Sequence, residues 1–413
     1  MFSSYLSRRL AAGIAAAGVA VLPLVPAAAQ DAIKVGAPLP LTGPLSPEGL
    51  KQKRGYDLWA ETANAKGGIK AGGKTYKVEI VYADYASNTP RAVQSAERMI
   101  TEDKVNFLFA PFGSGATKAT SAVSEKYGIP MIAPSASSAE IYDQGYKFIF
   151  GTLTGNETVS EPIAKLVTEK NPNIKRVAIL ARNDLFPLAV AQAFEKAVKG
   201  HKLDVVMFER YAIGTMDHAA AITQMRAANP DWVYVSGYIN DLMLVRRQMN
   251  DLGLKPQVLT MIAGPAYPEF AKTVGPLAEN ITTMSWWHPK VRYTGKDVFG
   301  STEAFNAAWA KKYGGEADYI DASSAVDGCV IQLAIEASTP SIRPRSAMRS
   351  RRSTSTPSTA RSSSARKGRS IRCSRRCCSF RAASRSCSGL PPSSRAICAP
   401  PSLNSFSTRH ARA

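Results

Sequence analysis

Three short polar loops of this 413-residue chain have the composition of an anion-binding site. They are residues 43–46 (GPLS), 111–115 (PFGSG) and 134–138 (PSASS), and each follows a short apolar run. Hydroxyl groups and free backbone N–H groups at helix starts suit an anion, above all a carboxylate. A single serine in such a loop could equally cap its helix, so both roles stay open for each residue. Several such loops on one sheet edge favour a binding edge.

Residue types that often carry catalysis or hold metals form no working pattern here. Residues 68–75 match the G-x-x-x-x-G-K-[ST] phosphate-loop spacing, but a helical pattern precedes them and a strand follows, the reverse of the required context. His201, His218 and His288 lack metal-type spacing, and Cys329 lies in an apolar helical pattern. We therefore expect a protein that is not an enzyme and that needs no cofactor or metal.

The elements that position the polar loops alternate between strand and helix. The first series has strands at 33–39, 76–83, 105–110, 130–133 and 147–150, with helices at 47–65, 89–103 and 116–127. The second has strands at 176–181, 203–209, 232–236 and 257–262, with helices at 187–199, 218–228 and 241–252. This alternation predicts an α/β fold of two Rossmann-like lobes, each a parallel sheet between helices, joined by a hinge near residues 151–155.

Two lobes account for residues 30–337. Lobe 1 is predicted to contain residues 30–151 and 279–337, including an apolar segment at 281–287 and helices at 301–313 and 323–337. Lobe 2 is predicted to contain residues 152–278. Ligands of such sheets bind beyond the carboxyl ends of the strands, where the polar loops lie.

The N-terminal segment indicates export. Arg8 and Arg9 precede an apolar stretch that ends in small residues, which predicts a signal peptide at 1–29, cleaved before Gln30. A membrane anchor is the alternative, but the stretch is short, rich in Ala and Gly and interrupted by proline. We expect a periplasmic protein.

The C-terminal segment has a different composition from the rest. Residues 338–413 hold 17 Lys and Arg with no Asp or Glu, which leaves +3 of the formal charge of +20 for residues 1–337. The charge is therefore no sign of a nucleic-acid-binding domain. A basic arm for anionic partners and a zinc site at its five cysteines are alternatives. Our hypothesis is that this Arg/Ser-rich tail is disordered or arises from a shifted reading frame.

Four segments together resemble the leucine/isoleucine/valine-binding protein family, the type I periplasmic solute-binding proteins of ABC importers. They are residues 33–44 (IKVGAPLPLTGP), 64–69 (NAKGGI), 128–136 (GIPMIAPSA) and 234–238 (YVSGY). The resemblance implies a monomer that binds a small molecule between its lobes, closes about the hinge and docks on an ABC permease. A ligand-sensing regulatory protein on the same fold is the rival interpretation.

The resemblance also implies ligand-contacting residues. Ser114 matches the hydroxyl that holds a ligand carboxylate, and Ser135 and Ser137 lie in the next contacting loop. Phe186 stands where the family often has a tyrosine that closes over the ligand, and Tyr238 matches another contact of lobe 2.

One departure from the family concerns the ligand ammonium. Branched-chain amino-acid binders usually have an acidic residue after the strand predicted at 257–262, whereas this chain has Ile262 followed by Ala, Gly and Pro. The ligand is then an amino-free aromatic or aliphatic acid, or an acid elsewhere, such as Asp184, supplies the charge. Trp286 and Trp287 are further candidates, as an aromatic wall.

Overall fold

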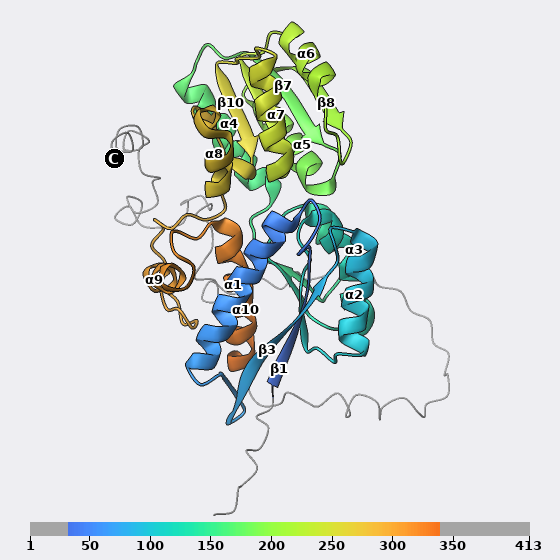
Figure 1. The fold of residues 1–413 in the computed structure, drawn as a ribbon, viewed down its shortest axis with the longest axis vertical. Coiled ribbons are helices and arrows are strands. Elements are labelled where there is room, and N and C mark those ends of the chain that lie inside the picture. The colour runs from blue at the N-terminus through green and yellow to red at the C-terminus, as the bar shows by residue number, and fades with distance from the viewer. Residues whose placement is uncertain (1–31, 339–413) are drawn as a thin grey trace, which may run out of the picture.

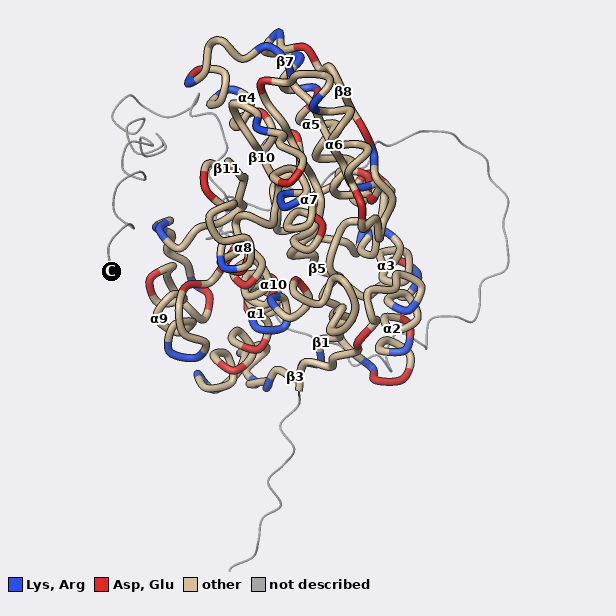
Figure 2. The backbone as a smooth tube through the Cα atoms, turned by 45° about the horizontal axis from the view of Figure 1, so that its top comes forward, with Lys and Arg blue, Asp and Glu red and all other residues tan. Residues whose placement is uncertain are grey.

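The computed structural model describes residues 32–338, which form two α/β lobes stacked along the long axis of the molecule (Figure 1). The predicted signal peptide (residues 1–29) lies outside the described residues, and so does the predicted tail after Ser338. Positions of Lys and Arg are interspersed with those of Asp and Glu along the backbone of both lobes (Figure 2). This mixture agrees with the near-neutral charge that the sequence predicts for the folded part.

Lobe 1 is built on a six-stranded sheet of order β2-β3-β1-β4-β5-β6. Its strands are β1 (Ala32–Leu39), β2 (Ile69–Ala71), β3 (Lys74–Asp84), β4 (Phe107–Phe109), β5 (Met131–Ala133) and β6 (Ile149–Gly151). All neighbours pair in parallel except the β2–β3 hairpin. Helix α1 (Ser46–Ala65) packs beside α10 (Tyr319–Ala337), and α2 (Thr89–Thr101) beside α3 (Ser114–Tyr127), on opposite sides of the sheet (Figure 1).

Lobe 2 is built on a five-stranded parallel sheet of order β11-β10-β9-β7-β8. Its strands are β7 (Arg176–Arg182), β8 (Asp204–Tyr211), β9 (Trp232–Ser236), β10 (Val258–Ile262) and β11 (Ile281–Thr282). Its helices are α4 (Asn156–Lys170), α5 (Leu185–Gly200), α6 (Ala219–Ala227), α7 (Ile239–Asp251) and α8 (Pro268–Val274). Every residue of β9 and β10 is buried, as expected for central strands covered on both faces. The predicted α/β class with two lobes is confirmed.

Two features of the second half differ from the prediction. The predicted return to lobe 1 at residue 279 is wrong, because Ile281 and Thr282 pair in parallel with Leu259 and Thr260 of β10. Lobe 2 thus continues to residue 282, and the apolar segment predicted at 281–287 forms a strand of only two residues. The sequence pattern also predicts no helix at α4, which contains Pro162.

Two segments connect the lobes, residues 152–155 after β6 and residues 283–301 before α9 (Thr302–Tyr313). They are tied together by a hydrogen bond from Trp286 Nε1 to the Thr154 carbonyl oxygen, at 3.1 Å. Helix α9 packs beside α1, where the Arg54 guanidinium lies over the Trp309 ring at 5.4 Å. Strand β1 runs toward lobe 2 (Figure 1), and β4 and β5 are parallel to it. The three polar loops, which follow the carboxyl ends of these strands, therefore lie at the junction of the lobes.

Candidate functional site

A small cavity lies between the lobes and is lined by residues from both. Its wall consists of Phe112, Ser135, Ser137, Leu153, Phe186, Tyr238, Ala263, Trp286 and Tyr319. Five of these nine residues are candidates from the sequence: the two serines, Phe186, Tyr238 and Trp286. The sequence-based site and the interlobe cavity therefore coincide in large part.

The lobe 1 side of the cavity carries a group of serines. Ser114 is the fully buried first residue of α3, and its Oγ lies 3.4 Å from the Ser138 backbone nitrogen, which donates to it. Ser137 Oγ donates to Asn156 Oδ1 at 2.7 Å, whereas Ser135 Oγ is buried without a partner among residues 32–338. Ser114 does not line the cavity itself but lies directly behind it. These hydroxyls and the N-terminus of α3 suit a carboxylate.

The α3 N-terminus requires a glycine for steric reasons. Gly113 has φ +87°, a conformation that other residues adopt only with strain. A Cβ atom at this position would also lie 3.0 Å from the Tyr238 hydroxyl oxygen. The glycine therefore lets the lobe 2 phenol approach the backbone at the start of α3.

Aromatic rings form the rest of the wall. Tyr238 lies 5.3 Å from Phe112 across the lobes and 6.2 Å from Phe186 within lobe 2, as ring centroid distances. Trp286 continues the wall, 6.0 Å from Phe186 and 5.1 Å from Tyr319. Such a wall favours a ligand with an apolar or aromatic body.

The buried ion pair of Arg182 and Asp241 contacts Tyr238. Arg182 Nη1 contacts Asp241 Oδ2 at 2.8 Å, and the Tyr238 backbone N–H donates to the same carboxylate at 3.1 Å. The Arg182 guanidinium also lies over the Tyr238 ring, 5.1 Å from its centroid. The pair positions the phenol and does not line the cavity.

Asp184 belongs to this network, although the sequence suggested it as an ammonium partner. It caps α5 by accepting from the Leu185 N–H at 2.7 Å, and it lies 3.6 Å from Arg182 Nε. Burial raises the pKa of its carboxyl, and the Arg182 charge opposes that rise. Asp184 does not line the cavity.

Glu48, in the first turn of α1, is a fully buried carboxylate at the lobe junction. Its Oε1 accepts from the backbone N–H of Ile239, the first residue of α7, at 3.2 Å, while Oε2 has no partner among residues 32–338. Burial raises the pKa of this carboxyl to about 7, because desolvation outweighs the hydrogen bond from Ile239. The sequence analysis did not single out Glu48, because an acid in a first helical turn ordinarily only complements the helix dipole.

The lobes are closed on each other. Besides the Glu48 contact, Asn240 Nδ2 donates to the Pro44 carbonyl oxygen at 3.0 Å. Lys51 Nζ of α1 contacts Glu269 Oε2 of α8 at 2.9 Å. Three hydrogen bonds or ion pairs thus join α1 and its preceding loop to lobe 2.

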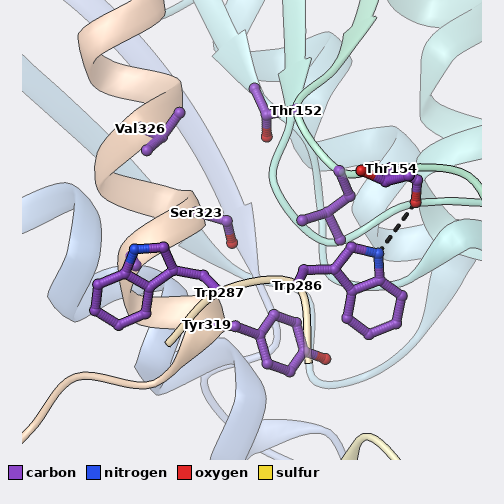
Figure 3. A pocket seen from close by; sticks show the side chains of 9 residues that line it. Thr152, Thr154, Trp286, Trp287, Tyr319, Ser323 and Val326 are labelled. Carbon is purple, nitrogen blue, oxygen red and sulfur yellow. Dashed lines mark hydrogen bonds between the residues drawn. The ribbon is translucent and has the colours of Figure 1, made fainter. Parts of the chain in front are cut away.

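A second cavity lies on the hinge side of the first and shares three of its wall residues, Leu153, Trp286 and Tyr319. Figure 3 shows Trp286 and Trp287 on the segment that enters lobe 1, with Thr152 and Thr154 from the other connection. Trp287 lines only this second cavity. Ile262, the buried last residue of β10, lines neither; the residue after it, Ala263, does so instead.

Four wall residues were missed from the sequence: Phe112, Leu153, Ala263 and Tyr319. Phe112 lies inside one of the predicted polar loops. Tyr319 had a usable signal, because Asp318 and Asp321 form a capping box that starts α10 four residues before the predicted helix. Ala263 has φ +80°, a strained conformation for alanine that no sequence pattern announces.

Residues 32–338 contain no group of three or more His, Cys, Asp or Glu side chains placed to hold a metal ion. Within the same residues, no helix combines the length and the apolar character needed to cross a membrane.

Comparison with known proteins decides the family. The family described as Periplasmic binding protein matches residues 32–375 of this sequence. The chain belongs to this family. Like its other members, this periplasmic binding protein is a solute-binding protein and not an enzyme. The match extends past Ser338, into the segment outside the described residues.

Curated relatives narrow the group to the Leu/Ile/Val-binding proteins. The Leu/Ile/Val-binding protein homolog 7 of Brucella abortus is 27% identical over 307 residues, 72% of this chain and 75% of the relative. The leucine-, isoleucine-, valine-, threonine-, and alanine-binding protein of Pseudomonas aeruginosa is 31% identical over 247 residues, 60% of this chain and 63% of the relative. The resemblance found in the sequence is confirmed.

Solved structures agree on the fold of this periplasmic binding protein. The branched-chain amino acid transporter substrate binding protein LivJ of Streptococcus pneumoniae, solved with isoleucine, has a TM-score of 0.66 and 26% identity, over 75% of this chain and 85% of that one. A solute binding protein of an R. palustris ABC transporter, solved with benzoate, has a TM-score of 0.63 and 20% identity. The match covers 74% of this chain and 81% of that one.

Proposed function

We propose that this protein is the periplasmic solute-binding component of an ABC importer. It binds a small carboxylate between its lobes, an amino acid of the branched-chain type in the first instance, and delivers it to a membrane permease as a monomer. We assign lobe 1 to residues 32–151 and 302–337, and lobe 2 to residues 156–282. The observation that carries the proposal is the closed interlobe cavity, with serines and the α3 N-terminus on one side and aromatic rings on the other.

The cavity has polar groups on one side and apolar groups on the other, which supports a ligand with a carboxylate at one end and an apolar body at the other. The carboxylate meets Ser135 and Ser137, and Ser114 at the start of α3 supports this loop through its hydrogen bond with the Ser138 N–H. The apolar body packs against Phe186, Tyr238 and the other rings of the wall. Both lobes contribute, so ligand contacts are complete only when the lobes close, as delivery by a closing protein requires.

Two observations favour a second ligand class. The loop after β10 offers no acidic side chain to an ammonium, and the cavity wall is mostly aromatic. An amino-free aromatic or aliphatic acid would meet both conditions. The two classes share the carboxylate and differ in the amino group.

Ligand-induced stabilisation of the purified full chain tests the proposal. Thermal unfolding is followed with L-leucine, L-isoleucine and L-phenylalanine, and with 4-methylpentanoate, 3-phenylpropanoate and benzoate. A ligand at 100 times its Kd stabilises the folded state by about 2.7 kcal/mol. Stabilisation by at least one of these acids, weakened in Ser114→Ala, is the expected result. No stabilisation by any of them would overturn the proposed ligand class.

A further inference from the structure

Glu48 carries an unmatched acceptor in the interior of the closed molecule. The residue is 0% exposed, and only one of its two carboxylate oxygens, Oε1, receives a hydrogen bond. Burying a carboxylate is unfavourable unless it is paired and fully hydrogen-bonded. Glu48 does not line either cavity, but its hydrogen-bond donor Ile239 adjoins the wall residue Tyr238, so a group that arrives with the ligand is a candidate partner for the unmatched oxygen.

The positive charge nearest to Glu48 is already engaged. Lys51, one turn further along α1, contacts Asp318 Oδ2 at 2.6 Å and Glu269 Oε2 at 2.9 Å. The other titratable groups that interact electrostatically with Glu48 are the acid Asp241 and four phenols, those of Tyr85, Tyr238, Tyr267 and Tyr319. None of these phenols or acids supplies a cation, so the surroundings of Glu48 lack a dedicated counter-charge.

Glu48 meets lobe 2 directly behind the cavity wall. Its hydrogen-bond donor, Ile239, follows the wall residue Tyr238 in the chain. Ile239 is also packed against Gly264, which follows the wall residue Ala263, since a Cβ on Gly264 would lie 3.4 Å from the Ile239 Cα. The carboxylate thus lies beside the loop after β10.

The loop after β10 carries no acidic side chain, since Ile262 is followed by Ala263, Gly264 and Pro265. Here Gly264 leaves no side chain in that position, and a Cβ there would already lie 2.9 Å from Leu242 Cδ1. The α7 N-terminus occupies the space and brings Ile239 to Glu48.

We propose that Glu48 pairs with the ammonium group of the ligand and makes the cleft selective for amino acids over acids that lack an amino group. This assignment rests on the proposed function. It also couples selection to closure, because Glu48 belongs to lobe 1 while its hydrogen-bond donor belongs to lobe 2. An ammonium held at this point bridges the lobes.

The test compares matched ligands on matched variants. The full chain is titrated calorimetrically with L-leucine and 4-methylpentanoate, and with L-phenylalanine and 3-phenylpropanoate, which differ only in the amino group. Wild type should bind the amino acid of a pair more tightly. Glu48→Gln should weaken the amino acid roughly 10- to 100-fold, as loss of a hydrogen bond to a charged group predicts, and leave the amino-free acid within about threefold.

Two further variants test whether the weaker binding of Glu48→Gln is specific to the carboxylate at this position. Glu102→Gln makes the same chemical change at an exposed position at the end of α2 and should bind like wild type. Glu48→Asp keeps the charge and should retain part of the preference for amino acids. If the amino-free acids bind wild type as tightly as the amino acids, the proposed function stands and the role of Glu48 is refuted. If no acid of either class binds, the proposed function fails as well.

Discussion

Replacing Glu48 by glutamine should change how the stability of the empty protein depends on pH. In the closed cleft the pKa of this carboxyl is about 7, against an ordinary value of 4.5, because burial disfavours the charged form. The folded state then binds the proton more tightly than the unfolded chain does. Ionised Glu48 therefore destabilises the folded state fully above pH 7. The penalty decreases as the pH falls from 7 to 4.5 and is absent below 4.5.

The size of the effect follows from the shift. One pKa unit corresponds to about 1.4 kcal/mol, so the rise from 4.5 to about 7 is worth about 3 kcal/mol at pH 8. Opening of the lobes exposes Glu48 and removes the penalty, so the free energy of opening limits what is measured. Glutamine carries no charge at any of these pH values. The stability of Glu48→Gln relative to wild type should therefore rise from pH 4.5 to pH 8 by up to this amount.

Urea denaturation of both empty proteins at pH 4.5, 6 and 8 measures the difference. Burial also raises the pKa of Asp321 to about 7, but this residue titrates in both proteins and cancels in the comparison. The reasoning is refuted if the difference in unfolding free energy stays constant over this range, or if it is larger at pH 4.5 than at pH 8.

Three other substitutions test the supports of the cleft, each by urea denaturation at pH 7. Trp286→Phe removes the indole N–H that joins the two connecting segments and should cost about 1 kcal/mol. Gly328→Ala places a Cβ against the Trp59 indole and should cost roughly 1–3 kcal/mol through overpacking of α10 on α1. Asp241→Asn leaves the buried Arg182 without its close partner and should cost about 3–5 kcal/mol.

Two of these substitutions, Gly328→Ala and Asp241→Asn, have a matched control in lobe 2. Gly200→Ala adds the same methyl group at the end of α5, where a Cβ meets nothing within 4 Å, and should leave stability nearly unchanged. Lys199→Ala breaks the exposed pair with Glu195 and should cost less than about 1 kcal/mol. Equal losses for Gly200→Ala and Gly328→Ala, or for Lys199→Ala and Asp241→Asn, would contradict the packing and ion-pair arguments.

The sheets were predictable because their strands are buried on both faces. Such strands appear as continuous apolar runs, as in β9 and β10, and the polar loops after β4 and β5 follow from where those runs end. Helix α4 was not predictable in the same way, since Pro162 lies within it. The two-residue strand β11 is set by pairing with β10, which no local pattern reveals.

The residues of the candidate site that lie in polar loops or match the resemblance could be predicted from the sequence. Residues that reach the site only through contact between the two lobes could not. Ser135, Ser137, Phe186 and Tyr238, which the resemblance predicts as ligand contacts, line the interlobe cavity. Glu48 acquires its place only when α7 docks against α1, a contact between residues nearly two hundred positions apart in the chain. A first-turn glutamate carries no mark of this in the sequence.

Trp286 touches the ligand cavity with its ring and the opposite connecting segment with its indole N–H. A side chain in this position is a natural optical reporter, because contact with a ligand and rotation of the lobes both change the environment of the same indole. It also means that no long relay is needed between recognition and movement. A ligand in contact with this ring would act directly on the hydrogen bond that joins the two connecting segments between the lobes.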